Sequence, residues 1–206
     1  MVSRFAVVEA PGELAVVQSL LNTAAVPKNG AALPDLLDTP DTAAAWLASV
    51  GAPTDQPGLR ELHRLRDALR AALISRDHEP SVENSMDGEI SMSVTVRLGS
   101  DGTVSVGPQP GEGLAERILL TVYAAQLTKD WSRLKVCRNP QCRVAFWDSS
   151  RNSSAVWHDS RTCGNIANLR NSRARRRTVT AGKPAPDPNP ATEGRNRATL
   201  PRRSGS

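Results

Sequence analysis

The strongest constraint on this chain is a cluster of metal-ligand side chains in its C-terminal half. All three cysteines of the 206-residue sequence, with one of its three histidines, form the pattern Cys137-x4-Cys142, fifteen residues, His158-x4-Cys163. Zinc takes four thiolate or imidazole ligands in a tetrahedron, and two closely spaced pairs allow two tight turns to supply them. Because protein side chains would fill all four positions, none stays open for a reacting water. The pattern predicts one structural Zn2+ ion bound by these four residues.

The alternative is that the thiols are small buried hydrophobes and His158 is a surface residue. Arg, Asn, Asp and Ser side chains flank the ligands, which disfavours an apolar burial site. A disulfide framework would leave one of the three cysteines unpaired. We expect the spacer to form a short hairpin from 143–147 and 154–157. Cys163-Gly164 should then open a helix whose free amides face the thiolate, which completes a treble-clef-like module.

Charge is divided unevenly along the chain. Residues 1–130 hold 10 Lys and Arg against 17 Asp and Glu, a net −7, whereas residues 131–206 hold 16 against 4, a net +12. This asymmetry predicts that the basic part binds a polyanion, and a solvated basic tail without a partner is the alternative. Five arginines are the candidate nucleic-acid contacts: Arg161, Arg170, Arg173, Arg176 and Arg177. In a helix after Cys163, Arg170, Arg173 and Arg177 would share one face and could neutralise several phosphates.

The first 130 residues have the patterns of a mainly helical α+β domain. Apolar periodicity predicts helices within 5–26, from about 40 to 50, over 58–76 and over about 114–129. Alternating residues between Ile90 and Val106, with Gly99 to Gly102 between them, predict a β-hairpin. Residues 77–90 are expected to form an acidic loop, and 179–206 are too rich in proline and arginine to support a core.

No segment is long and apolar enough to span a bilayer, and the N-terminus lacks the features of a signal peptide, so we expect a soluble cytoplasmic protein. No set of catalytic residues stands out, which favours a protein that is not an enzyme. Asn22-Thr23 is interpreted either as a helix end or as part of a pocket wall. Trp46 is interpreted as a core residue rather than a ligand contact.

Several motifs carry a family resemblance. The specific ones are Cys137-x4-Cys142, Phe146-Trp147-Asp148-Ser149-Ser150-Arg151-Asn152, Trp157-His158 and Cys163-Gly164-Asn165. Looser ones are Leu20-Leu21-Asn22-Thr23, Asp35-Leu36-Leu37, Trp46-Leu47 and Leu65-Arg66-x3-Arg70. Together they resemble the CGNR zinc-finger proteins, whose N-terminal part is the ABATE domain. Two positions depart from the family pattern: the third ligand, more often Cys, is His158, and the final Arg of the motif is Ile166.

The resemblance implies a stress-induced bacterial transcription regulator with a DNA-binding zinc module and a sensor-like N-terminal domain. We therefore expect three parts: an ABATE-like domain at 1–130, a CGNR-type zinc finger at 131–178 and a disordered tail at 179–206. The expected partners are DNA and a small-molecule effector whose binding residues are unknown, and the oligomeric state is open. The alternative function is a zinc-stabilised protein-interaction module without sequence-specific DNA binding.

Overall fold

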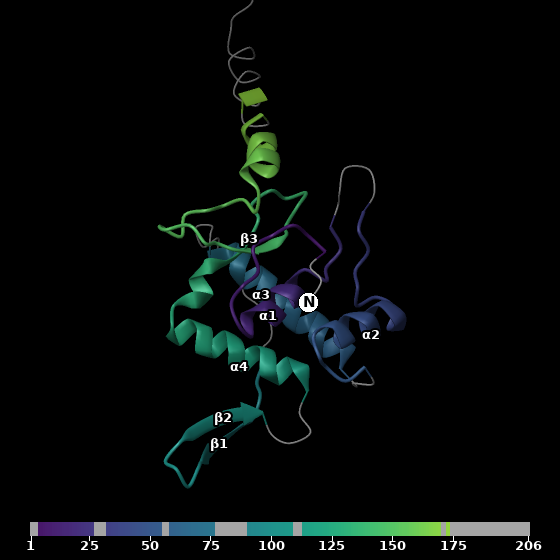
Figure 1. Ribbon diagram of the computed structural model, residues 1–206. Coiled ribbons are helices and arrows are strands. Elements are labelled where there is room, and N and C mark those ends of the chain that lie inside the picture. Colours follow the sequence, from purple (N-terminus) through teal and green to yellow (C-terminus); the bar gives the residue numbers. More distant parts are fainter. Residues whose placement is uncertain are drawn as a thin grey trace, which may run out of the picture. The chain divides into compact units, whose positions relative to one another are not determined.

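The computed structural model describes residues 4–26, 32–54, 58–76, 90–108, 113–169 and 172–173 (Figure 1). The chain divides into two compact units, residues 1–168 and 169–206. All the elements below belong to the first unit, because only residues 169, 172 and 173 of the second are described. The predicted tail at 179–206 and nearly all of the predicted acidic loop at 77–90 lie outside the described residues.

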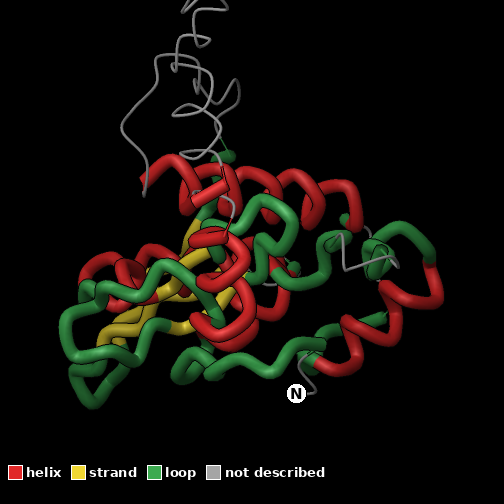
Figure 2. Tube along the Cα trace, turned by 90° about the horizontal axis from the view of Figure 1, so that it is seen from above, coloured by secondary structure: helices red, strands yellow, loops and turns green. Residues whose placement is uncertain are grey.

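Helices are the main regular elements of the first unit, and long loops and short strands connect them (Figure 2). Its four longer helices are α1 (Leu14–Leu21), α2 (Pro40–Ser49), α3 (Leu59–Arg76) and α4 (Leu114–Leu127). The short α1 is central, because it packs against both α3 and α4. Its side chains Val17, Leu20 and Leu21 are fully buried, and each such burial stabilises the fold by roughly 1.5–3 kcal/mol.

The ends of α2 follow from local sequence. Thr39 Oγ1 accepts a hydrogen bond from the Thr42 backbone N–H at 3.3 Å, and Pro40 occupies the first helical turn, where its missing N–H is not needed. Just beyond the last turn, Gly51 adopts φ +67°, a left-handed conformation that glycine takes without a steric penalty. These are the start and stop signals that the sequence predicts.

Two antiparallel hairpins complete the unit. Strands β1 (Val94–Leu98) and β2 (Val104–Pro108) pair in the register Val96↔Val106, which confirms the predicted first hairpin. After a short 3-10 helix, η1 (Asp130–Arg133), strand β3 (Leu134–Val136) pairs with β4 (Ala145–Trp147). The predicted fold class is thereby confirmed: a mainly helical α+β part with a hairpin, followed by a small zinc module.

The predicted strand pairing inside the zinc module is wrong. Residues 145–147 form a strand, but their partner is β3, which precedes the first cysteine, and residues 154–157 are described without any strand. Strand β3 carries Leu134 and Val136, which are buried in the helical core, so pairing β4 with β3 joins the hairpin to that core, whereas Ala155 and Trp157 pack against the cysteine cluster. The first ligand pair therefore lies in the turn of the β3–β4 hairpin.

The β3–β4 hairpin shares the core of the helices. Leu134, Val136 and Ala145 belong to the same buried cluster as the apolar faces of α1, α3 and α4. At the end of α1, Asn22 binds β4 through its side-chain amide. Its Oδ1 accepts the Ala145 N–H at 2.8 Å, and its Nδ2 donates to the Ala145 carbonyl at 2.9 Å. The domain boundary at 130/131 stays a prediction, although the segments on both sides of it contribute to one core.

Arg66 is a charged residue on the buried face of α3. Its side chain is almost fully buried and forms a 2.7 Å ion pair with Asp35. The same guanidinium donates to Thr23 Oγ1 at 3.2 Å and lies 3.0 Å from Nδ1 of the half-buried His63. Burial alone would lower the pKa of Arg66, but hydrogen bonds and charges from Asp35 and Asp67 raise it, so the side chain stays charged.

Candidate metal centre

The first ligand pair is presented by a tight turn built around Asn139. Cys137 directly follows β3, and the Cys142 N–H returns to the Asn139 carbonyl at 2.8 Å. The buried Asn139 side chain fixes the turn further, because its Oδ1 accepts the Gln141 N–H at 3.2 Å. Arg143 leaves the turn at φ +53°, so the chain reverses into β4 with both sulfurs on the inner side of the turn.

The second ligand pair lies at a short π-helical turn, η2 (Ser160–Gly164), with His158 just before the turn and Cys163 within it. Asp159 caps this turn, as its carboxylate accepts the Arg161 N–H and the Thr162 hydroxyl, each at 2.8 Å. The predicted amide contacts to the thiolate are wrong, because the Cys163 and Gly164 amides both donate to the Asp159 carbonyl. The sulfur of Cys163 instead accepts a hydrogen bond from Asn139 Nδ2 at 3.4 Å, which links the two turns.

The two turns bring the four predicted ligands together. One donor atom from each of Cys137, Cys142, His158 and Cys163 lies within 4.8 Å of every other, and the cysteines are buried while His158 is half-buried. Cys142 Sγ lies 3.3 Å from His158 Nδ1, close to the roughly 3.6 Å edge of a tetrahedral zinc site with these donors. The hydrogen bond from the Cys142 thiol lowers the pKa of Cys137, whereas the same contact and burial raise the pKa of Cys142, so the first thiolate of the pair forms at Cys137.

Gly164 allows the second turn to pack closely. A Cβ atom at this position would lie 3.3 Å from Cδ1 of Trp157, tighter than an ordinary van der Waals contact. The glycine therefore lets the indole ring before His158 lie against the backbone after Cys163. Ile166, where the family pattern has Arg, is half-buried and lines a cavity of about 520 Å3 with the ligands Cys142, His158 and Cys163.

Comparison with known families agrees with this geometry. Residues 133–176, which include all four ligands, match the CGNR zinc finger. Residues 14–130, more than half of the chain, match the ABATE family, described as "Putative stress-induced transcription regulator". The chain belongs to the ABATE family. No curated protein matches it. With the CGNR match and a fitting donor set, the Cys3His cluster is a structural site for one zinc ion.

The spacer of this ABATE protein is held by a buried ion pair. Lys135 Nζ donates to Asp148 Oδ2 at 2.7 Å, and both side chains are at least nine-tenths buried. Asp148 also accepts the backbone N–H groups of Ser150 and Ala155 at 2.9 and 2.8 Å. Burial opposes the charge, but the hydrogen bonds from Lys135 and these amides outweigh it and lower the pKa of Asp148 to about 2. The ion pair thus fixes residues 148–155, the connection between the two ligand pairs, to strand β3.

The candidate nucleic-acid contacts are only partly within the described residues. Arg161 lies in η2 and is exposed, and Arg173 is also exposed. Arg170, Arg176 and Arg177 lie outside the described residues. Residues 165–168 continue from η2 as α-helix, which agrees with the helix predicted after Cys163. Within the described part of the chain, no helix is both long and apolar enough to cross a membrane.

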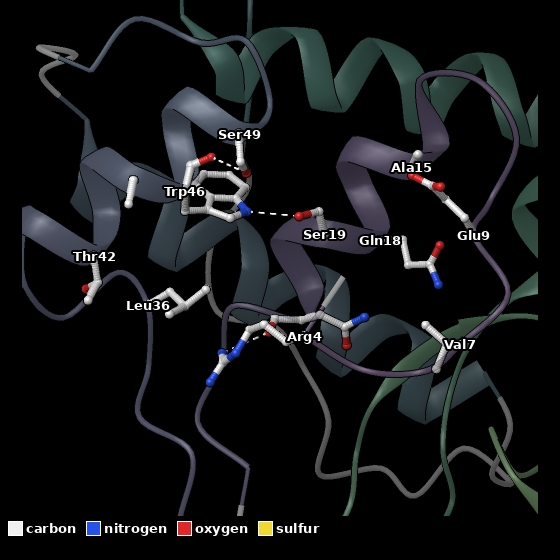
Figure 3. A pocket seen from close by; sticks show the side chains of 12 residues that line it. Arg4, Val7, Glu9, Ala15, Gln18, Ser19, Leu36, Thr42, Trp46 and Ser49 are labelled. Carbon is white, nitrogen blue, oxygen red and sulfur yellow. Dashed lines mark hydrogen bonds between the residues drawn. The ribbon is translucent and has the colours of Figure 1, made fainter. Parts of the chain in front are cut away.

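A second candidate site is a cavity of about 260 Å3 between the N-terminal segment, α1 and α2 (Figure 3). Trp46 forms one wall and donates from its indole nitrogen to Ser19 Oγ at 3.0 Å. Trp46 is therefore both a core residue, as predicted, and part of this wall. Asn22 likewise ends α1 and lines the cavity, so both interpretations of this residue hold.

Arg4 and Glu9 both line this cavity, so it holds one charged group of each sign. The Arg4 guanidinium donates to the backbone carbonyls of Asn22, Thr23 and Pro34 at 2.8–3.1 Å, and it forms no ion pair with any carboxylate in the described part of the chain. Burial lowers the pKa of Arg4, and the charge of Asp35 only partly opposes this. Neutral carbonyls stabilise the cation less than an anion would. The cavity therefore combines a guanidinium held by backbone carbonyls with the Glu9 carboxylate and an apolar indole wall.

Proposed function

We propose that this ABATE protein regulates transcription by binding DNA through its zinc module. The observation that carries the proposal is the Cys3His cluster, which fixes η2 and the helical turn after it at the start of the most basic part of the chain. Arg161 is exposed on η2, and further arginines follow in sequence. The N-terminal 130 residues carry a net −7 and would be repelled by phosphate, so binding is assigned to the basic C-terminal part.

Replacing both Arg173 and Arg177 with Ala should weaken DNA binding through loss of phosphate contacts. Each contact releases condensed counterions, so the slope of log affinity against log salt should fall by roughly 2 if both residues touch phosphate. Gel-shift titrations at several salt concentrations, first on the protein's own promoter region, measure this slope. The matched control replaces Arg202 and Arg203 with Ala and removes the same charge from the far C-terminal end.

If the control abolishes binding while the Arg173 and Arg177 substitutions leave it intact, the zinc module does not read DNA. The zinc-stabilised protein-interaction module would then replace the proposal. Equal loss in both double variants, without any dependence on DNA sequence, would likewise reduce the DNA contact to nonspecific charge attraction.

We further propose that the cavity beside Arg4 and Trp46 binds the effector of this regulator, a small organic anion with an apolar body. Two contacts connect the cavity wall to the zinc module. Gln18 and Asn22, which both line the cavity, donate from their side-chain amides to the Ala145 carbonyl of β4 at 3.4 and 2.9 Å. A ligand that shifts either amide would change the support of β4 and hence of the turn that follows β3.

Benzoate and its neutral amide, benzamide, are matched probes for this cavity. Benzoate should raise the melting temperature of the full chain because the Arg4 guanidinium binds its carboxylate, whereas benzamide should have little effect. Replacing Arg4 with Gln should remove the difference between the probes, and replacing it with Lys should keep part of it. Thermal melts with isothermal titration measure both quantities. An equal response to the two probes would contradict an anion site.

A further inference from the structure

The β1–β2 hairpin exposes one continuous apolar face. Val94, Val96 and Leu98 alternate along β1 and therefore point to one side of the sheet, and Val104 and Val106 lie directly across from Leu98 and Val96. These side chains are between 43 and 74% exposed. The opposite side of the same hairpin carries Thr, Arg, Ser and Gly. One face is therefore apolar and the other polar, a division that strand propensity alone does not require.

The apolar face continues onto α4. Val106 and Pro108 share a groove with Leu120, Thr121 and Ala124 of the helix. One helical turn beyond, Tyr123 and Leu127 are 59 and 68% exposed on the same half of the helix as Leu120. In Figure 1 the hairpin extends from α4 away from α1 and α3. The exposed apolar side chains of hairpin and helix together present roughly 700 Å2, above the largest patch of a typical monomer, about 300–600 Å2.

The chain itself offers little to cover this face. Outside the described residues, the segments beside the hairpin are 77–89 and 109–112, which contain only Val82 and Met86 as large apolar side chains. The segment from 174 to the C-terminus adds only Val179 and Leu200. A two-stranded hairpin is marginally stable in water unless another layer packs against it. Helix α4 packs on β2, and a second apolar surface laid over the exposed face would add the layer that further stabilises the hairpin.

We propose that this surface, the apolar face of β1–β2 with Tyr123 and Leu127 of α4, is the interface of a homodimer. Two copies related by a two-fold axis would place identical apolar faces against each other, and such a contact closes without open-ended growth. About 1,400 Å2 would be buried in total, which lies within the roughly 1,200–2,000 Å2 of specific interfaces. None of the seven side chains is charged, so their association requires no ion to lose its water. The inference does not depend on DNA or effector binding.

The test compares two substitutions that introduce the same residue on opposite faces of one strand. Sedimentation velocity and light scattering of the full chain, from about 1 to about 100 μM, should show twice the chain mass for the wild type. Val96→Glu should raise the dimer dissociation constant about 100-fold or more, because two carboxylates per dimer would enter the apolar interface. Arg97→Glu, on the other face, should leave it within a few-fold. Leu127→Lys tests the same surface on α4 without altering the hairpin.

Three outcomes would overturn the inference. The first is a wild-type chain that stays monomeric over the whole concentration range. The second is equal weakening by Val96→Glu and Arg97→Glu, and the third is growth of large aggregates without a discrete dimer. Because Val96 is 63% exposed in the monomer, Val96→Glu should keep the fold and the bound zinc, which circular dichroism and metal analysis verify.

Discussion

Removal of zinc should unfold the region from residue 137 to 168 and destabilise the helical core that shares the β3–β4 hairpin. The regular structure of this region is limited to the three-residue strand β4, the turn η2 and the short helix after it, so the metal provides much of its folding free energy, about 10 kcal/mol or more in zinc-finger peptides. Helices α1 to α4 should persist. Their melting temperature should fall, because Leu134, Val136 and Ala145 of the β3–β4 hairpin contribute to their core. Hydrogen exchange of the full chain, before and after chelation, would resolve the two regions.

Metal analysis provides the controls. Wild type should contain one zinc ion per chain, and Cys142→Ser or His158→Ala should lose it. His158→Cys should keep it, since a thiolate suits zinc at this position and the CGNR family more often has Cys there. If the wild type folds normally without metal, or if Cys142→Ser keeps full occupancy, the zinc site does not hold this region together.

Replacing Asp148 with Ala should lower the free energy of unfolding by about 3–5 kcal/mol, the range for breaking a buried ion pair from one side. The reason is that Lys135 would lose its anionic partner while almost fully buried, and the amides of Ser150 and Ala155 would lose their acceptor. Urea unfolding at neutral pH measures the change. The double variant Lys135→Met with Asp148→Leu should recover part of the loss, because it leaves no unpaired charge.

The ion pair also has a defined pH dependence. The pKa of Asp148 is lowered to about 2 in the folded chain, so its carboxylate stabilises the fold above about pH 4. This contribution should disappear as the pH falls from about 4 to about 2. The difference in stability between wild type and Asp148→Asn isolates it, since acid release of zinc affects both proteins. A difference that stays constant over this pH range would show that the charge of Asp148 does not stabilise the spacer.

The sequence predicted those parts of the fold that depend on residues close together in the chain. The spacing of cysteine and histidine identified all four zinc ligands, because each pair is presented by one short turn. Apolar periodicity and capping residues placed α2, α3 and α4 closely. The pairing of β4 was predicted wrongly, since it depends on which neighbouring strand can bury apolar side chains against helices distant in sequence.

The polar contacts of the core were missed for a related reason. Arg66 lies seven residues before Leu73 and four after Leu62, so its spacing did place it on the buried face of α3. A charged residue on such a face indicates a buried partner, but the sequence alone does not identify Asp35 as that partner. The amide of Asn22 binds a backbone more than 120 residues away, and only the folded chain reveals such a contact.

The Asn22 side chain also covers the outer edge of strand β4. By binding both the N–H and the carbonyl of Ala145, its amide occupies the edge of β4 where a further strand would add. One side chain thus protects the β3–β4 sheet against the misassembly that unpaired strand edges invite. Substitutions at Asn22 would therefore affect solubility as well as stability, because they would expose the outer edge of β4.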